Sequence, residues 1–183
     1  MFARTRRLLL RPGWREDAPA LAAAIADQMI VRNLATAPWP FRLRDAEAFL
    51  AQPRDPVLPS FLIFERTGGE PRLVGACGLG RRPSGLVELG YWIARSDWGR
   101  GFASEAGAAL IQIARALDLP QLEGSHFIDN PGSGRVLDKL GFEPVGITAP
   151  RPSCARGADA QARLYRLVLS ERSAAAEEEP LAA

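Results

Sequence analysis

Short runs of apolar residues, separated by turn-forming residues, predict strands in the middle of the chain. Residues 60–66, 72–80 and 86–94 are rich in aliphatic and aromatic side chains, and the segments TGGEP and RRPSG between them are typical of hairpin turns. A first strand at residues 8–10 ends at a Pro-Gly pair. Three further strands are expected at residues 122–128, 142–147 and 163–169.

Apolar residues spaced three or four positions apart predict helices between these strands. The clearest pattern runs through residues 101–117, where Phe102, Ala106 and Leu110 fall on one face. The other helices are expected at residues 16–28, 45–52 and 131–140. For the last of them, Asn130 suits the N-cap, Pro131 the first helical position and Gly141 the C-terminal cap.

In chain order these elements form a β-α-α-β-β-β-α-β-α-β-β pattern. This order predicts an α+β fold, in which a mixed sheet carries helices on its faces. A chain of 183 residues fits one domain with a sizeable core, which we assign to residues 4–170. Residues 171–183 contain few large apolar side chains, so we expect a disordered tail there.

The composition excludes several function classes. Hydrophobic residues make up 47% of the chain and the net charge is only +2, so neither a nucleic acid nor an anionic membrane is expected as a partner. The apolar run at residues 8–10 is too short for a signal peptide or a membrane span, and we expect a cytoplasmic protein. Cys77 and Cys154 form no CxxC pattern and His126 is the only histidine, so no metal site is expected.

The segment ELGYWIARSDWGRGFAS (residues 88–104) carries the most specific signal. A strand ends, a loop follows with Gly99 and Gly101, and an amphipathic helix begins at once. Glycine allows positive φ angles and close approach of a ligand, while a helix start offers free N–H groups and the positive end of the helix dipole. We therefore predict a pyrophosphate site with Arg100 as an added cation. The two glycines are also compatible with a tight turn that binds nothing.

Two other phosphate-binding motifs do not fit this loop. A dinucleotide-binding site would require GxGxxG after the first strand, and a P-loop would require a lysine before Ser or Thr. Here the third glycine is missing, the loop contains no lysine, and it lies past the middle of the chain.

The segments ELGYWIARSDWGRGFASEA and DNPGSGRVLDKLGFEPVG resemble the ribosomal-protein alanine acetyltransferase (RimJ/RimL-type) branch of the GNAT superfamily of N-acetyltransferases. The opening RTRRLLLRPGWREDAPAL resembles the first strand and helix of that branch, so the resemblance covers residues 4–170. The superfamily's loop pattern is Q/R-x-x-G-x-G/A, and Trp98 stands at its first position, as is common in this branch. The resemblance implies the GNAT fold, with splayed central strands, and acetyl-CoA as the co-substrate.

The resemblance also implies where the cofactor binds. Backbone amides from Arg100 to Ser104 would hold the CoA pyrophosphate, the strand at residues 91–93 would offer backbone groups to the pantetheine, and Asn130 and Ser133 match an N-x-x-S segment beside the thioester. Asn130 could equally be only a helix cap, and the two tryptophans only packing residues. The candidate cofactor-binding residues are Tyr91, Trp92, Ile93, Trp98, Gly99, Arg100, Gly101, Phe102, Ala103, Ser104, Asn130 and Ser133.

Attack of an amine on the thioester requires a base, a polarised carbonyl and a proton for the leaving thiolate. Glu88, at the start of the central strand, is the preferred base, acting through water, with a merely solvated carboxylate as the alternative. Many GNAT enzymes use a tyrosine as the acid, but the matching position here is Leu137, so Ser133 is the nearest candidate donor or else a capping hydroxyl. His126 is a third candidate because imidazoles titrate near neutral pH. A backbone N–H near Ile93 could hold the oxyanion.

The acceptor is an amine, and its groove is expected to be lined by the aromatic loop with Asn33, Trp39 and Phe41. An α-amino group has a pKa of about 7.7–8.0 and a lysine side chain about 10.4, so the neutral form at pH 7 costs about 1.2 or about 4.6 kcal/mol. The absence of an obvious strong base therefore favours a protein N-terminal amine. A small-molecule amine such as a polyamine or an antibiotic, and a non-catalytic acyl-CoA-binding domain, are the alternatives. Acidic residues in the groove would favour the polyamine.

Overall fold

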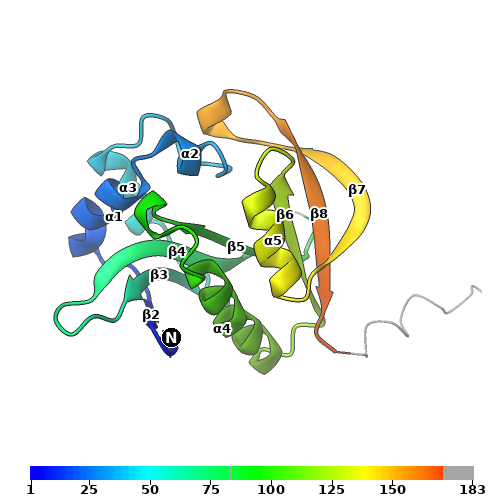
Figure 1. Ribbon diagram of the computed structural model, residues 1–183, viewed down its shortest axis with the longest axis horizontal. Coiled ribbons are helices and arrows are strands. Elements are labelled where there is room, and N and C mark those ends of the chain that lie inside the picture. The colour runs from blue at the N-terminus through cyan, green and yellow to red at the C-terminus, as the bar shows by residue number, and fades with distance from the viewer. Residues whose placement is uncertain (83, 171–183) are drawn as a thin grey trace, which may run out of the picture.

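A mixed sheet of eight strands forms the centre of the structure, a computed structural model that describes residues 1–82 and 84–170 (Figure 1). Its strands are β1 (Ala3–Arg4), β2 (Leu8–Arg11), β3 (Ser60–Glu65), β4 (Arg72–Arg81), β5 (Val87–Ile93), β6 (Gln121–Phe127), β7 (Glu143–Arg151) and β8 (Ala160–Val168). They lie in the order β1-β2-β3-β4-β5-β6-β8-β7. The β5–β6 pair is parallel and the other neighbouring pairs are antiparallel.

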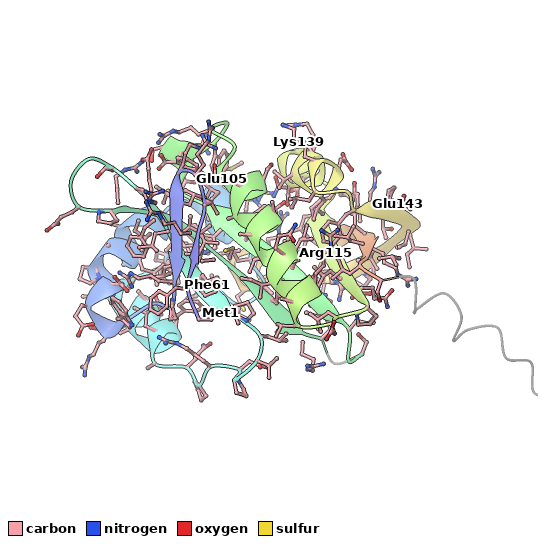
Figure 2. The ribbon with its side chains drawn as sticks, turned by 90° about the horizontal axis from the view of Figure 1, so that it is seen from below. Met1, Phe61, Glu105, Arg115, Lys139 and Glu143 are labelled. Atoms are coloured by element: carbon pink, nitrogen blue, oxygen red, sulfur yellow. The ribbon has the colours of Figure 1, made fainter. Side chains whose placement is uncertain are left out.

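Helices cover both faces of this sheet. They are α1 (Ala18–Ile25), α2 (Gln28–Val31), α3 (Leu43–Leu50), α4 (Phe102–Ala116) and α5 (Pro131–Lys139), with short 3-10 helices η1 (Arg15–Asp17), η2 (Arg95–Asp97) and η3 (Cys154–Arg156). Figure 1 shows α1, α2 and α3 gathered at one end of the molecule and β7 at the other. In Figure 2, α4 crosses the sheet from Glu105, beside β1 and β2, to Arg115.

Side chains alternate between two cores because successive residues of a strand point to opposite faces. On one face, Leu89 and Ile93 of β5 belong to the same buried cluster as Phe102 and Leu110 of α4. On the other face, Leu62 and Ala76 join Leu21 of α1 and Ala46 of α3. Helix α4 also makes the crossover connection between the parallel strands β5 and β6, as parallel pairing requires.

The predicted α+β fold, a mixed sheet with helices on its faces, is confirmed, and the errors of the prediction concern the bounds of single elements. The helix expected at residues 16–28 is divided, because Ala26 leaves helical geometry and Asp27 starts α2 by accepting a hydrogen bond from the Met29 N–H at 2.7 Å. The aromatic loop that carries Asn33, Trp39 and Phe41 therefore begins only after α2, which ends at Val31. The strand expected at residues 142–147 continues to Arg151. The predicted tail, residues 171–183, lies outside the described residues.

No helix within residues 1–82 and 84–170 is long and apolar enough to cross a bilayer.

Candidate functional site

The loop between β5 and α4 has the conformation of an anion-binding turn. Gly99 and Gly101 have φ angles of 77° and 80°, the left-handed region that favours glycine. Gly101 is the N-cap of α4, and no side chain in the described part of the chain caps this helix start. The N–H groups of the first turn, which have no intrahelical acceptor, are therefore free for a ligand, at the positive end of a 15-residue helix.

A pocket of about 470 Å³ opens at this helix start, between β5, α2 and the first turns of α4 and α5. Every predicted cofactor-binding residue except Arg100 lines it, and Asn33, predicted for the acceptor side, lines it too. We call this cavity the donor pocket.

Several residues of the donor pocket were not predicted from the sequence. Met29 and Ile30 of α2 form part of its wall, and Arg135 and Lys139 of α5 add two cations one helical turn apart. Figure 2 shows Lys139 near the end of α5. The i, i+4 spacing of the two basic residues was visible in the sequence, but only the fold shows that this face of α5 meets the start of α4.

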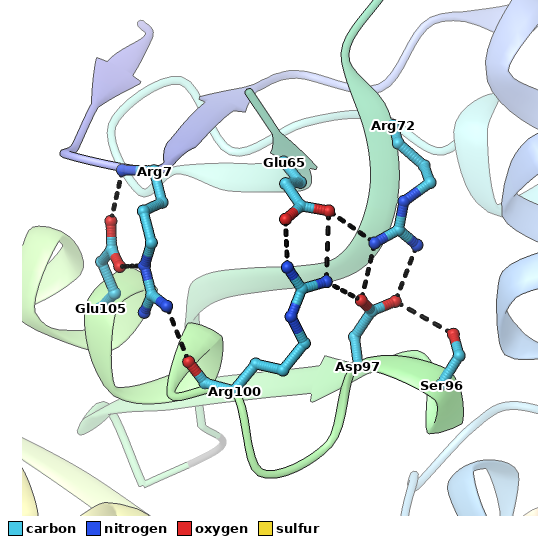
Figure 3. A network of polar contacts seen from close by, with 7 residues as sticks. All are labelled: Arg7, Glu65, Arg72, Ser96, Asp97, Arg100 and Glu105. Atoms are coloured by element: carbon cyan, nitrogen blue, oxygen red, sulfur yellow. Dashed lines mark hydrogen bonds and ion pairs between the residues drawn. The ribbon is translucent and has the colours of Figure 1, made fainter. Parts of the chain in front are cut away.

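The Arg100 guanidinium is held away from the donor pocket by carboxylates. Its Nη1 donates to Asp97 Oδ1 at 2.6 Å and to Glu65 Oε2 at 3.2 Å, and its Nη2 pairs with Glu65 Oε1 (Figure 3). Arg72 donates to both oxygens of Asp97, at 2.7 and 2.8 Å, and to Glu65 at 2.6 Å. The expectation that the Arg100 side chain adds a phosphate-binding cation is therefore not supported by its position.

Asp97 is the centre of this network. Its side chain is almost fully buried, and the hydrogen bonds from Arg72, together with those from Arg100 and Ser96, lower its pKa to about 2 against the opposing effect of burial. Asp97 closes η2, so the network fixes the loop that leads to Gly99 and Gly101.

A second set of contacts fixes the start of α4. The Arg7 N–H and Nε donate to the two oxygens of Glu105, at 2.8 and 2.7 Å, and Thr5 Oγ1 donates to Oε1 at 2.6 Å. Arg7 Nη1 also donates to the Arg100 carbonyl oxygen at 2.9 Å (Figure 3). The turn between β1 and β2 thus holds both the loop and the first turn of α4, which pre-organises the anion-binding N–H groups.

Strands β5 and β6 diverge beside the donor pocket. Their single bridge joins Glu88 to Glu123, at the start of β5. The Ala94 N–H donates to the Val74 carbonyl at 2.8 Å and so points toward β4. Because N–H groups of successive strand residues point to opposite neighbours, those of Tyr91 and Ile93 point toward β6. The Trp98 indole N–H occupies the Ile93 carbonyl at 2.7 Å, which explains how a tryptophan can serve at the first position of this loop.

Ser133 and Tyr91 meet across the divergence. The Tyr91 hydroxyl lies 2.8 Å from Ser133 Oγ and donates to the Ser133 carbonyl oxygen at 3.0 Å. Burial raises the pKa of Tyr91 to about 12, so the phenol remains protonated at neutral pH. Asn130 occupies the N-cap position of α5, but its side chain makes no capping hydrogen bond within the described residues, and it lines the donor pocket instead.

Glu88 lies beyond the pocket linings, on the face of the sheet that carries α1 and α3. It accepts a hydrogen bond from Ser125 Oγ at 2.7 Å, and Arg82 Nε lies 3.3 Å from its other oxygen. Gly90 and Trp92 follow on the same face, with Gly90 about 7 Å further along the strand. Glu88 therefore lies on the same face of the sheet as Gly90 and Trp92, two positions before Gly90 along β5.

The structure does not bring His126 to this site. Its side chain is buried beneath α5, with Nδ1 2.8 Å from the Phe127 carbonyl oxygen and its ring 5.5 Å from that of Tyr165. A Cβ at Gly134 would lie only 2.8 Å from its Nε2, so α5 packs directly on the imidazole.

A second pocket, of about 420 Å³, lies on the α1–α3 side of β5. We call it the acceptor pocket. Phe41 lines it as predicted, whereas Trp39 belongs to the same loop but is exposed and is not among the lining residues. Tyr91 and Trp92 line both pockets, so the donor and acceptor pockets meet at the middle of β5.

Residues 7–143 match the family described as "Acetyltransferase (GNAT) domain". The chain belongs to the GNAT acetyltransferase family. It is therefore an N-acetyltransferase, and acetyl-CoA is its acetyl donor.

Individual relatives are distant. The chain is 29% identical over 150 residues to the uncharacterized N-acetyltransferase p20 of Bacillus licheniformis, covering 78% of this chain and 83% of that protein. A GNAT-family acetyltransferase from Bacillus anthracis has a similar structure, with a TM-score of 0.78 at 21% identity over 93% of this chain and 100% of that one. The ribosomal L7/L12 α-N-protein acetyltransferase RimL, solved with coenzyme A, gives a TM-score of 0.75 at 17% identity, over 92% and 98% of the two chains.

Proposed function

We propose that this acetyltransferase modifies the N-terminal amine of a peptide or protein. The observation that carries the proposal is the meeting of two unlike pockets at Tyr91 and Trp92. The donor pocket has the uncapped helix start and the cations Arg135 and Lys139, whereas the acceptor pocket is mainly apolar. RimL, which has a similar fold, is named as an acetyltransferase of a protein α-amino group.

The residues of the donor pocket fit acetyl-CoA. The free N–H groups of residues 102–104 and the left-handed glycines suit a pyrophosphate, and Arg135 and Lys139 suit further phosphate charge. The peptide N–H groups of Tyr91 and Ile93 and the side chain of Asn130 suit the amides of a pantetheine chain. When bound there, acetyl-CoA supplies an activated acyl group next to β5.

Groups of this chain can serve each requirement of the transfer. Glu88 accepts the amine proton through water, since it faces the acceptor side and keeps a donor partner in Ser125. The Ile93 N–H stabilises the oxyanion, because it points into the divergence and has no strand partner there. Ser133 donates a proton toward the departing sulfur, and Tyr91 holds the serine hydroxyl in place.

The scarcity of charged side chains in the acceptor pocket disfavours the polyamine alternative. Among the described lining residues, Asp45 carries the only charged side chain, and its Oδ2 already accepts the Arg42 N–H at 2.7 Å. An acceptor with several ammonium groups would lack partners for them, which is costly once the groups lose water. A single amine of low pKa suits this pocket better.

Two peptides that differ in the position of their free amine test the proposal. The first has a free N-terminus and no lysine, and the second has a blocked N-terminus and one internal lysine. With acetyl-CoA, we expect thiol release from the first peptide alone and a mass increase located at its N-terminus. Acetylation of the lysine peptide, or of spermidine in its place, would contradict the proposal.

A further inference from the structure

We propose that the acceptor pocket selects an amine next to a bulky, uncharged apolar group, and that Gly90 sets this selectivity. The inference rests on the proposed function, since it names the chemistry of the residue that carries the reacting amine.

The floor of the acceptor pocket is a row of small residues. Ser60 of β3 lies opposite Gly78 of β4, and Gly78 lies opposite Gly90 of β5. Directly opposed residues of antiparallel strands share a face, so three neighbouring strands present only one hydroxymethyl group between them here. The next row, with Leu62, Ala76 and Trp92, is filled. The sheet is therefore hollow just beside the residues that both pockets share.

Glycine occupies the two positions 78 and 90 of this row for different reasons. A Cβ at Gly78 would lie 2.9 Å from the Pro59 carbonyl oxygen, so the backbone at the start of β3 excludes a side chain there. A Cβ at Gly90 would meet nothing within 4 Å, and Gly90 has no positive φ angle. Neither packing nor backbone conformation requires glycine at position 90. Glycine at this position leaves the space above β5 open to the acceptor.

The walls above this floor are mainly apolar. Their apolar side chains include Leu21, Ile25, Leu34, Phe41, Ala48 and Phe49, of which Phe49 is 42% exposed, and Thr36 and Gln52 are uncharged polar residues of the same lining. Asp45 is the only charged lining residue among those described, and it caps its own helix. A charged group entering this pocket would lose water without gaining a free counter-charge, whereas an apolar group gains by the same burial.

The size of the pocket suits one large side chain. Its volume of about 420 Å³ lies at the lower end of the range of about 300–1,000 Å³ common for small-ligand sites. An amine anchored near Tyr91, where the pockets meet, would direct the neighbouring group over Gly90 toward α3. The acceptor is thus an N-terminus that begins with a large apolar residue.

The test uses hexapeptides that differ only in their first residue, which is Phe, Leu, Ala, Asp or Lys. With saturating acetyl-CoA and the intact chain, kcat/KM for the Phe and Leu peptides should exceed that for the Asp and Lys peptides by about tenfold or more. Gly90→Val should lower kcat/KM for the Phe peptide about tenfold and for the Ala peptide much less, with an unchanged acetyl-CoA Kd. Gly68→Val is the control, because a Cβ there also meets nothing within 4 Å and Gly68 lines neither pocket.

Two failures are distinguishable. Equal turnover of all five peptides, a preference for the charged ones, or an unaltered Phe preference in Gly90→Val would overturn the selectivity while leaving N-terminal acetylation in place. If the wild-type chain binds acetyl-CoA but acetylates no peptide N-terminus, the proposed function fails, and the selectivity fails with it.

Discussion

The hydroxyl of Tyr91 on β5 donates to the backbone carbonyl of Ser133 at the start of α5, while its oxygen lies 2.8 Å from Ser133 Oγ. A phenol has one proton, and a carbonyl can only accept. With the Tyr91 proton on the carbonyl, the Ser133 hydroxyl is left as the donor of the pair, free to donate to Tyr91 or to a group in the donor pocket. Tyr91 is therefore a positioning residue for Ser133.

This pair predicts coupled effects on turnover. Ser133→Ala should lower kcat about 10²-fold, and Tyr91→Phe should lower it by a smaller factor, with acetyl-CoA Kd nearly unchanged in both. Because Tyr91 acts through Ser133, the double variant should be no slower than Ser133→Ala. Thiol-release kinetics and calorimetric titration measure these quantities. Independent, multiplicative losses would contradict the positioning role.

Glu88→Gln should lower kcat by about 10²-fold, because the amide cannot accept the amine proton. The amide can still accept the hydrogen bond from Ser125, so the fold and acetyl-CoA Kd should stay the same. Ser125→Ala, which removes that hydrogen bond and keeps the carboxylate, is the matched control and should have a much smaller effect. Full activity in Glu88→Gln would assign proton removal to solvent.

Ser104→Glu separates anion binding from stability at the start of α4. A carboxylate in the first helical turn stabilises a helix by about 0.3–1 kcal/mol, so the thermal midpoint should not fall. The same charge beside the pyrophosphate should weaken acetyl-CoA binding at least about tenfold, since like charges near a protein surface repel by a few kcal/mol. Ser104→Gln, of the same size and neutral, should bind nearly as tightly as the wild type. Equal acetyl-CoA affinity of the two variants would show that the pyrophosphate does not bind at this helix start.

The salt dependence of acetyl-CoA binding should distinguish the two cations of the donor pocket, Arg135 and Lys139, from Arg100. Arg135→Ala and Lys139→Ala should each weaken acetyl-CoA binding about twofold to fivefold and flatten its salt dependence, as exposed ion pairs do. Arg100→Ala should leave that salt dependence unchanged, because its guanidinium pairs with Glu65 and Asp97. Titration at two salt concentrations distinguishes the variants, and a flattened slope in Arg100→Ala alone would reverse the assignment.

Asp97 predicts how stability depends on pH. Its folded pKa of about 2 lies below the ordinary value of 3.8, so ionised Asp97 stabilises the fold above pH 3.8, and this contribution is lost as the pH falls through about 2. The difference corresponds to about 2 kcal/mol. Asp97→Asn should lose that much stability at pH 7 and approach the wild type near pH 2, as followed by urea unfolding. The exposed Asp159→Asn is the control, and a pH-independent difference for Asp97→Asn would contradict the assignment.

Features set by neighbouring residues were predictable from the sequence. Gly99 and Gly101 have the positive φ angles that a strand–loop–helix pattern requires, and Pro131 and Gly141 delimit α5 as expected. The four-residue helix α2 was missed because it is too short to show a period and because Asp27 separates it from α1.

Features set by contacts between distant segments were not predictable. Of the two carboxylates that hold Arg100, Glu65 lies 35 positions away in the sequence and could not be inferred as a partner, so the guanidinium was expected to face the ligand. His126 and Glu88 lie on neighbouring strands, yet the strand pleat places them on opposite faces of the sheet. Only the packed sheet shows that Glu88, and not His126, shares a face with Gly90 and Trp92 of the acceptor pocket.

Lys139 has a consequence for chemical labelling. It is the only lysine in the 183 residues and it lines the donor pocket. An amine-reactive reagent has one side-chain target on this chain, beside the cofactor's binding surface. Its rate of reaction there, followed by mass spectrometry, reports occupancy of the donor pocket directly, so cofactor affinity can be measured without an acceptor, a coupled assay or an engineered probe.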